Sequence, residues 1–87
     1  MSISHVFDTY ATTQKGRIMH FDVVLNEQNP AVALGYAREW LEHIGEGDAA
    51  VTLNTCVFCH SAEAPAALQH DIAQQGYAII KMEGCPI

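Results

Sequence analysis

The sequence predicts an α+β domain built as a two-layer sandwich, in which a mixed four-stranded sheet carries two helices on one face. Two runs that alternate apolar and polar residues flank a glycine turn and indicate a β-hairpin. Two later segments have helical periodicity, and each has a short strand-like run after it. The predicted order is therefore β-β-α-β-α-β. A chain of 87 residues can bury one core, and we expect a single domain over residues 1–87.

Residues 3–12 and 17–25 are predicted to be the strands of the hairpin, with a three-residue loop that ends at Gly16. Such a loop ends in a left-handed residue, which glycine adopts without steric cost. Thr13 then faces Arg17. In this register one face carries His5, Phe7, Thr9 and Ala11 beside Leu25, Val23, Phe21 and Met19, and the other carries Val6, Asp8 and Tyr10 opposite Val24, Asp22 and His20. A slip by one residue would mix the two sets, so the pattern selects this register.

The first helix is predicted to begin at Asn29-Pro30, because an asparagine side chain caps a helix and proline fits its first position. Gly45 marks its end. The apolar stripe that follows the helical period consists of Ala33, Ala37, Trp40, Leu41 and Ile44. This stripe is expected to face the sheet.

The remaining segments are predicted to be a third strand at residues 50–55, a second helix at 65–75 that stops at Gly76, and a fourth strand at 77–82. The connection between the last two strands is just long enough for a right-handed crossover. We therefore expect these two strands to be parallel.

The charge balance argues against two classes of partner. The chain has ten acidic and four basic residues, a net charge of −6, and the basic residues are scattered. Nucleic acids and anionic membrane surfaces are bound by clustered positive charge, so neither is expected as a partner. The first residues show no basic segment followed by an apolar one, which predicts no secretory signal and a cytoplasmic location with reduced thiols.

The most distinctive stretch is 56–60, which reads Cys-Val-Phe-Cys-His and directly follows the predicted third strand. Cys85 follows the predicted fourth strand. Since parallel strands end at the same edge of a sheet, Cys56, Cys59, His60 and Cys85 are expected to converge. Thiolates and an imidazole at this spacing suit tetrahedral zinc or a similar soft-ligand metal. Four such ligands would make a closed, structural site.

Three other interpretations of these cysteines stay open. In a reversible dithiol, Cys56 would attack and Cys59 would resolve, although Pro65 starts the next helix too far away to polarise the thiol. The stretch also matches the c-type haem attachment pattern, but without the export signal that attachment requires. Finally, cysteine is among the most buried residue types, so the three thiols could simply pack in the core.

A second cluster lies on the polar face of the hairpin, where Asp8 is opposite Asp22 and Tyr10 is opposite His20. Two facing carboxylates repel, so one tends to hold a proton or to share a cation. Paired acids beside a histidine suit acid-base chemistry or a divalent ion. The plainer interpretation is an ordinary solvated sheet face.

Four motifs resemble those of a family of small uncharacterised bacterial proteins, the domain of unknown function DUF2024, and the resemblance covers nearly the whole chain. The motifs are Asp8-Thr9-Tyr10-x-Thr12, Gly16-Arg17-x-Met19-His20-Phe21-Asp22, Cys56-x-Phe58-Cys59-His60 and Gly76-Tyr77-x-Ile79-Ile80-x-Met82-Glu83-Gly84-Cys85. The resemblance implies an α/β fold of mixed strands and helices. Because the family has no established activity, it assigns no catalytic role to these positions.

Three classes of function follow from these observations. The first is a metal-binding domain, with zinc as the cofactor of the cysteine-histidine cluster. The second is a thiol-disulfide redox protein. The third is an interaction module that forms a homodimer through its open sheet face. No enzyme class is favoured.

Overall fold

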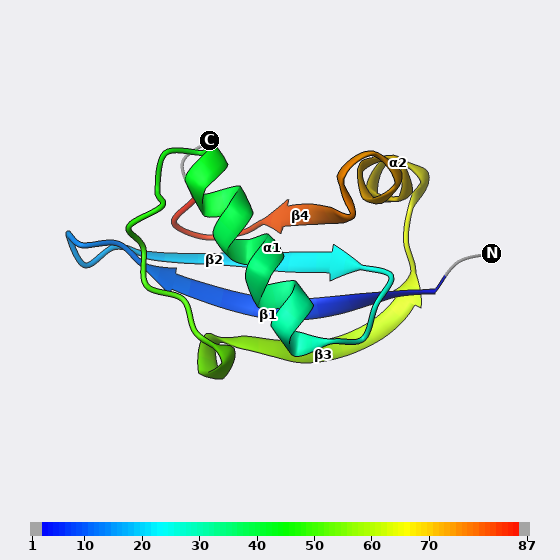
Figure 1. Ribbon diagram of the computed structural model, residues 1–87, viewed down its shortest axis with the longest axis horizontal. Helices are drawn as coiled ribbons and strands as arrows, with labels where there is room; N and C mark the ends of the chain where they lie inside the picture. Colours follow the sequence, from blue (N-terminus) through cyan, green and yellow to red (C-terminus); the bar gives the residue numbers. More distant parts are fainter. Residues whose placement is uncertain (1–2, 86–87) are drawn as a thin grey trace.

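The computed structural model describes residues 3–85 of the chain (Figure 1). Its elements are β1 (Ile3–Thr12), β2 (Ile18–Leu25), α1 (Pro30–His43), a short 3-10 turn (Leu53–Thr55), β3 (Cys56–Glu63), α2 (Ala66–Gln75) and β4 (Tyr77–Lys81). The predicted α+β class and the order β-β-α-β-α-β are confirmed.

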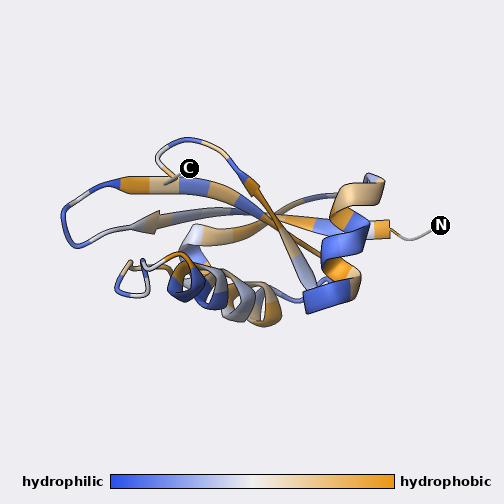
Figure 2. Cartoon of the chain, turned by 90° about the horizontal axis from the view of Figure 1, so that it is seen from above, coloured by the Kyte–Doolittle hydropathy of each residue, from blue (hydrophilic) through white to orange (hydrophobic). Residues whose placement is uncertain are grey.

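The hairpin of β1 and β2 has the predicted register, with His5 facing Leu25 and Thr12 facing Ile18. The backbone N–H of Thr13 donates to the carbonyl of Arg17 at 2.8 Å, and Gly16 has a φ of 86°. The tip of the hairpin is hydrophilic (Figure 2). Hydrophobic patterning and one glycine are therefore enough to set this part of the fold.

Helix α1 begins and ends as predicted. The Asn29 side chain accepts hydrogen bonds from the N–H groups of Ala31 and Val32, at 3.0 and 3.4 Å, and Pro30 is the first helical residue. The residues that α1 buries are Ala33, Ala37, Trp40 and Leu41. They pack on the hairpin face that carries Phe7, Phe21 and Leu25, which forms the main core.

The third strand lies later in the chain than predicted, at Cys56–Glu63 rather than at residues 50–55. Thr52 caps a 3-10 turn at Leu53–Thr55, with its hydroxyl accepting from the Asn54 N–H at 3.2 Å. The alternation of apolar residues before Cys56 imitates a strand, but these residues form a turn because local side-chain capping competes with strand pairing.

The prediction of a mixed sheet is wrong. The strand order is β3-β1-β2-β4, and β1 with β2, β1 with β3, and β2 with β4 are all antiparallel. β3 and β4 therefore lie at opposite edges and run in opposite directions (Figure 1). Helix α2 crosses the end of the sheet between the two edges, so it returns the chain instead of making a parallel crossover.

The prediction that both helices cover one face is also wrong. Helix α1 packs on the side chains of Phe7, Phe21 and Val23, whereas Ile72 of α2 packs with Val6, Val24 and Ala78. Neighbouring residues of a strand point to opposite faces, so α1 and α2 lie on opposite sides of the sheet. Figure 2 shows α1 on one side of the twisted sheet and α2 across its end.

The face opposite α1, which we call the open face, is only partly covered. Helix α2 covers its end near Val6 and Val24. The remainder, from Asp8 to Tyr10 and from His20 to Asp22, has no helix over it in the described part of the chain (Figure 2). Neither of the helices within residues 3–85 is long and apolar enough to cross a membrane.

Candidate functional site

The four predicted ligands of the cysteine-histidine cluster do not converge. Cys56, Cys59 and His60 lie on β3 at one edge of the sheet, and Cys85 follows β4 at the other edge. None of the four belongs to a group of three or more potential ligands within 4.8 Å among residues 3–85. The prediction failed because it required β3 and β4 to be parallel neighbours.

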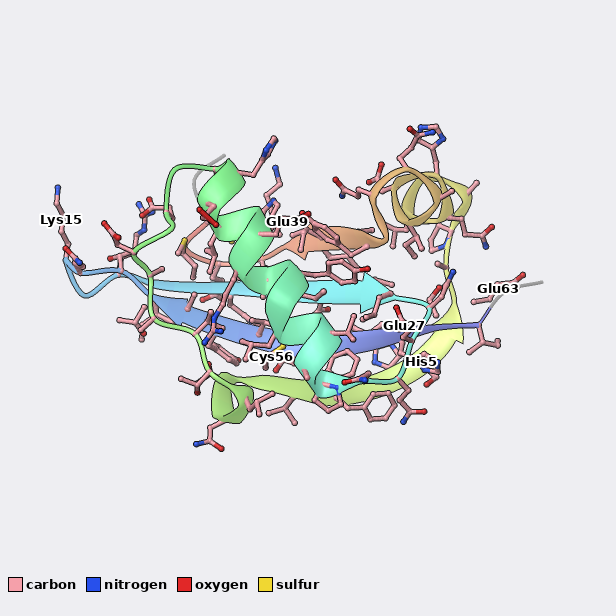
Figure 3. All side chains as sticks on the ribbon, in the orientation of Figure 1. His5, Lys15, Glu27, Glu39, Cys56 and Glu63 are labelled. Carbon is pink, nitrogen blue, oxygen red and sulfur yellow. The ribbon has the colours of Figure 1, made fainter. Side chains whose placement is uncertain are left out.

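Cys56 is a core residue. It is 1% exposed, packs in the α1 side of the sheet (Figure 3), and receives a hydrogen bond from the Thr9 hydroxyl at 3.5 Å. Burial raises the pKa of its thiol, and the bond from Thr9 offsets this only in part. A buried thiol with a raised pKa is a poor nucleophile, which argues against both the dithiol and the haem interpretations.

The geometry of β3 argues further against an internal dithiol. Cys56 and Cys59 are three residues apart on an extended strand, which separates their Cα atoms by roughly 10 Å. A disulfide requires a Cα separation of about 4.4–6.8 Å. Cys59 is exposed, and its Sγ instead contacts Nδ1 of His60 at 3.2 Å.

Cys85 has a different role in the fold. Its thiol donates a hydrogen bond to the backbone carbonyl of His20 at 3.4 Å. The same carbonyl accepts from the N–H of Met82, and the N–H of His20 donates to the carbonyl of Glu83. The segment after β4 therefore fixes the backbone of His20, a residue of the polar cluster.

The polar cluster is assembled as its register requires. One ligand atom each from Asp8, His20 and Asp22 lie within 4.8 Å of one another, and this is the one group of that kind in the described chain. His20 Nε2 is hydrogen-bonded to Asp8 Oδ1. The Tyr10 ring stacks on the His20 ring, with centroids 4.2 Å apart and planes 9° apart, and thereby fixes the orientation of the imidazole.

Asp22 is the least solvated member of this cluster, with 8% of its surface exposed. Burial raises the pKa of its carboxyl, and the charge of Asp8 beside it raises the pKa further. His20 and His60 act in the opposite direction. Burial and a like charge both disfavour the carboxylate, so a cation placed here would gain more than at an exposed aspartate.

A small apolar groove adjoins the cluster on the same face. Its volume is about 130 Å³, and it is lined by Ser4, Val6, Val24, His60, Ala62, Glu63, Ala64, Pro65, Leu68 and Ile80. Ile80 pairs with Asp22 across β2 and β4, so the groove reaches the edge of the cluster.

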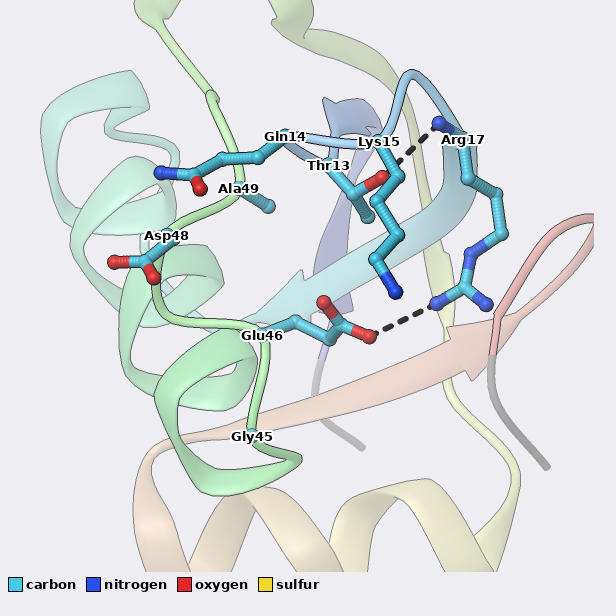
Figure 4. A pocket seen from close by; sticks show the side chains of 8 residues that line it. All are labelled: Thr13, Gln14, Lys15, Arg17, Gly45, Glu46, Asp48 and Ala49. Carbon is cyan, nitrogen blue, oxygen red and sulfur yellow. Dashed lines mark hydrogen bonds and ion pairs between the residues drawn. The ribbon is translucent and has the colours of Figure 1, made fainter.

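A second hollow, of about 350 Å³, lies between the hairpin tip and the loop after α1 (Figure 4). Lys15, Arg17, Glu46 and Asp48 are among its lining residues, and Arg17 pairs with Glu46 at 2.9 Å. The opposite charges balance one another, so this hollow favours no ligand of either sign.

The fold and the cluster define a small α+β domain with an antiparallel sheet, one covered face and a polar cluster on the other. The family model of the domain of unknown function DUF2024 matches residues 1–82, and the chain belongs to this family. The NMR structure of protein NE1680 from Nitrosomonas europaea is similar, with 45% identity over 97% of this chain and 99% of that chain and a TM-score of 0.86. No protein of curated function matches the chain.

Proposed function

We propose that this protein binds a divalent metal ion on its open face through Asp8, His20 and Asp22. The observation that carries the proposal is the convergence of two carboxylates and one imidazole within 4.8 Å of one another. Oxygen and nitrogen donors of these types are common ligands of zinc, manganese and iron. The proposal replaces a zinc site at the cysteines, which the topology separates.

The electrostatics of the cluster support a cation. Within residues 3–85, Arg17 forms an ion pair with Glu46, and the partner of Asp8 is the imidazole of His20. Neither carboxylate of the cluster is therefore paired with a lysine or arginine in the described part of the chain. Two acids in contact, one of them buried, are stabilised by a divalent ion, and that ion would replace the hydrogen bond between His20 and Asp8.

Metal titration of chelator-treated protein tests the proposal. Titration calorimetry with Zn²⁺ and Mn²⁺ should give about one equivalent per chain for at least one of these ions. The variants Asp8→Asn and Asp22→Asn should each bind at least about tenfold more weakly, since even outer-sphere partners of a metal typically contribute that much. Asp71→Asn, an exposed aspartate of α2, is the matched control and should bind as the wild type does.

Two results would contradict the proposal. One is the absence of uptake of either ion by the wild-type protein. The other is equal affinity in the wild type and in both cluster variants, which would place the bound ion elsewhere. Self-association through the open face stays a prediction. It would use the same surface that carries the polar cluster.

A further inference from the structure

A β-bulge in β3 turns His60 toward the open face. Phe7 of β1 faces Phe58, but the next residue, Val6, faces His60, so Cys59 is an extra residue in the ladder. Without this extra residue Cys59 would stand opposite Val6. Bulges of this kind redirect a side chain at a chosen point of a strand, and they are frequent beside functional sites.

The position of His60 follows from its partner. Facing residues of paired strands point to the same side of a sheet, and Val6 packs with Ile72 and Val24 on the open face. His60 also borders the groove that Val6, Val24 and Ile80 line. Val6, Val24 and His60 form one row across the strands on this face. The next row on the same face contains Asp8 and Asp22, which lie opposite each other on β1 and β2. His60 is thus one row away from the cluster, on the neighbouring strand.

The imidazole of His60 is exposed and has one nitrogen available. The residue is exposed, and its Nδ1 contacts the Cys59 thiol at 3.2 Å, which leaves Nε2 without a partner in residues 3–85. Because the side chain is exposed, a change of rotamer would move Nε2 along the open face.

We propose that His60 is a fourth ligand of the ion held by Asp8, His20 and Asp22, and that the resulting set of two imidazoles and two carboxylates selects a first-row transition ion over Mg²⁺ and Ca²⁺. This inference rests on the proposed function and specifies its metal class. Carboxylates alone suit hard cations such as Mg²⁺ and Ca²⁺, whereas each added imidazole favours zinc, iron or cobalt. His60 therefore sets the selectivity of the site.

The test compares His60→Asn with the wild type and with His43→Asn, a matched exposed histidine on α1 at the other face of the sheet. Zn²⁺ affinity is measured by calorimetry with and without an excess of Mg²⁺. Co²⁺ is titrated in parallel, because its visible absorption is much stronger in four-coordinate than in six-coordinate sites. A direct ligand should contribute at least as much as an outer-sphere one, so His60→Asn should bind Zn²⁺ about tenfold or more weakly and lose the intense Co²⁺ bands.

The outcomes separate this inference from the proposed function. If His60→Asn binds Zn²⁺ as tightly as the wild type, with the same Co²⁺ spectrum, the inference is overturned while a three-ligand site stands. If Asp8→Asn and Asp22→Asn also bind normally, both ideas fail. Loss of affinity in His60→Asn but not in His43→Asn, together with weaker discrimination against Mg²⁺, supports the inference.

Discussion

Asp22 is the residue at which the requirements of folding and of the candidate site conflict. It is 8% exposed and lies directly opposite Asp8. A buried carboxylate next to a like charge destabilises the folded chain. The same arrangement favours a divalent ion, which compensates the charge. Destabilising arrangements of this kind are commonly retained at functional sites.

Asp22→Asn is expected to change stability in opposite directions with and without metal. In chelator at neutral pH the variant should be more stable than the wild type, because it removes a buried charge and supplies an amide N–H that can donate to Asp8. In excess Zn²⁺ the order should reverse, since Zn²⁺ at about 100 times the wild-type Kd adds about 2.7 kcal/mol to the wild type but only about 1.4 kcal/mol to a variant that binds tenfold more weakly. Denaturant unfolding under both conditions measures this.

The control for this experiment is Asp71→Asn. Because Asp71 is exposed, the unfolding free energies of this variant in chelator and in excess Zn²⁺ should each stay within about 0.5 kcal/mol of the wild type. A less stable Asp22→Asn protein in chelator would show that the carboxylate stabilises the metal-free fold. That result would contradict the destabilising repulsion between Asp8 and Asp22.

Tyr77 links stability to alkaline pH. It is 3% exposed, and burial together with the nearby Glu39 carboxylate raises its pKa to about 12. The unfolded phenol ionises near 10, so the unfolded state releases this proton first and the stabilisation falls as pH rises from about 10 to about 12. At about pH 11 the loss should be on the order of 1 kcal/mol.

Tyr77→Phe should abolish that part of the pH dependence. The unfolding free energies of the variant and the wild type are measured between about pH 9 and pH 11. The stability of the wild type relative to the variant should fall by on the order of 1 kcal/mol over this range. Tyr10→Phe, on the exposed side of the sheet, is the control. If the unfolding free energies of Tyr77→Phe and the wild type differ by a constant amount across this range, the pH dependence does not come from Tyr77.

At the scale of single residues, the polar cluster was predictable and the position of His60 was not. The alternation along residues 3–12 and the glycine loop determine which side chains of the hairpin face each other, so Asp8, Asp22, Tyr10 and His20 could be grouped from sequence. The bulge at Cys59 depends on how β3 pairs with β1, and the sequence around it carries no glycine to signal it.

At the scale of elements, the helices and the hairpin follow local signals, whereas β3 does not. Asn29, Pro30 and Gly76 mark the helix boundaries through caps and backbone conformation. β3 lies at a sheet edge and all but its first residue are exposed, so it shows no alternation of burial. Its bounds depend on tertiary pairing with β1, which the sequence pattern does not show.

The segment after β4 is an element-scale support of the site. Gly84 has a φ of 76°, and a Cβ atom there would overlap the backbone oxygen of Ile18. Gly84→Ala should therefore lower the unfolding free energy by more than about 1 kcal/mol, measured by denaturant unfolding. Amide exchange should become faster at Met82, whose N–H donates to the carbonyl of His20, and at His20, whose N–H donates to the carbonyl of Glu83.

A second glycine gives a matched control for this substitution. Gly35 lies inside α1, and a Cβ atom there would meet nothing within 4 Å. Gly35→Ala should raise the stability by up to about 1 kcal/mol, as expected for this exchange in a helix. Equal effects of the two substitutions would mean that the loop at Gly84 adapts to a side chain.

At the scale of the whole molecule, the error in topology explains the error in the metal site. Hydrophobic patterns show which face of a strand is buried, but they do not show which strands are neighbours. The length of the segment between β3 and β4 permits a parallel crossover, and also permits a helix that crosses the end of the sheet. The second arrangement separates the cysteines by the width of two strands.

The two sides of the sheet are unequal in their packing, which predicts unequal local stability. Helix α1 buries Ala33, Ala37, Trp40 and Leu41 in the main core, whereas α2 buries only Ile72, with Leu68 partly buried. Regions with few buried apolar contacts open at a lower free energy than the core. The groove beside the candidate site is bounded by α2, so opening of α2 would also widen this groove.

Native-state hydrogen exchange should show this difference directly. Amide hydrogens of residues 70–75 in α2 should exchange faster than those of residues 37–43 in α1, at a pH where exchange reports opening free energies. Leu68→Ala should lower the opening free energy of α2 by about 1 kcal/mol further, because it removes part of a half-buried leucine, and should change α1 less. Equal protection of both helices, falling together in Leu68→Ala, would show instead that the domain opens as one cooperative unit.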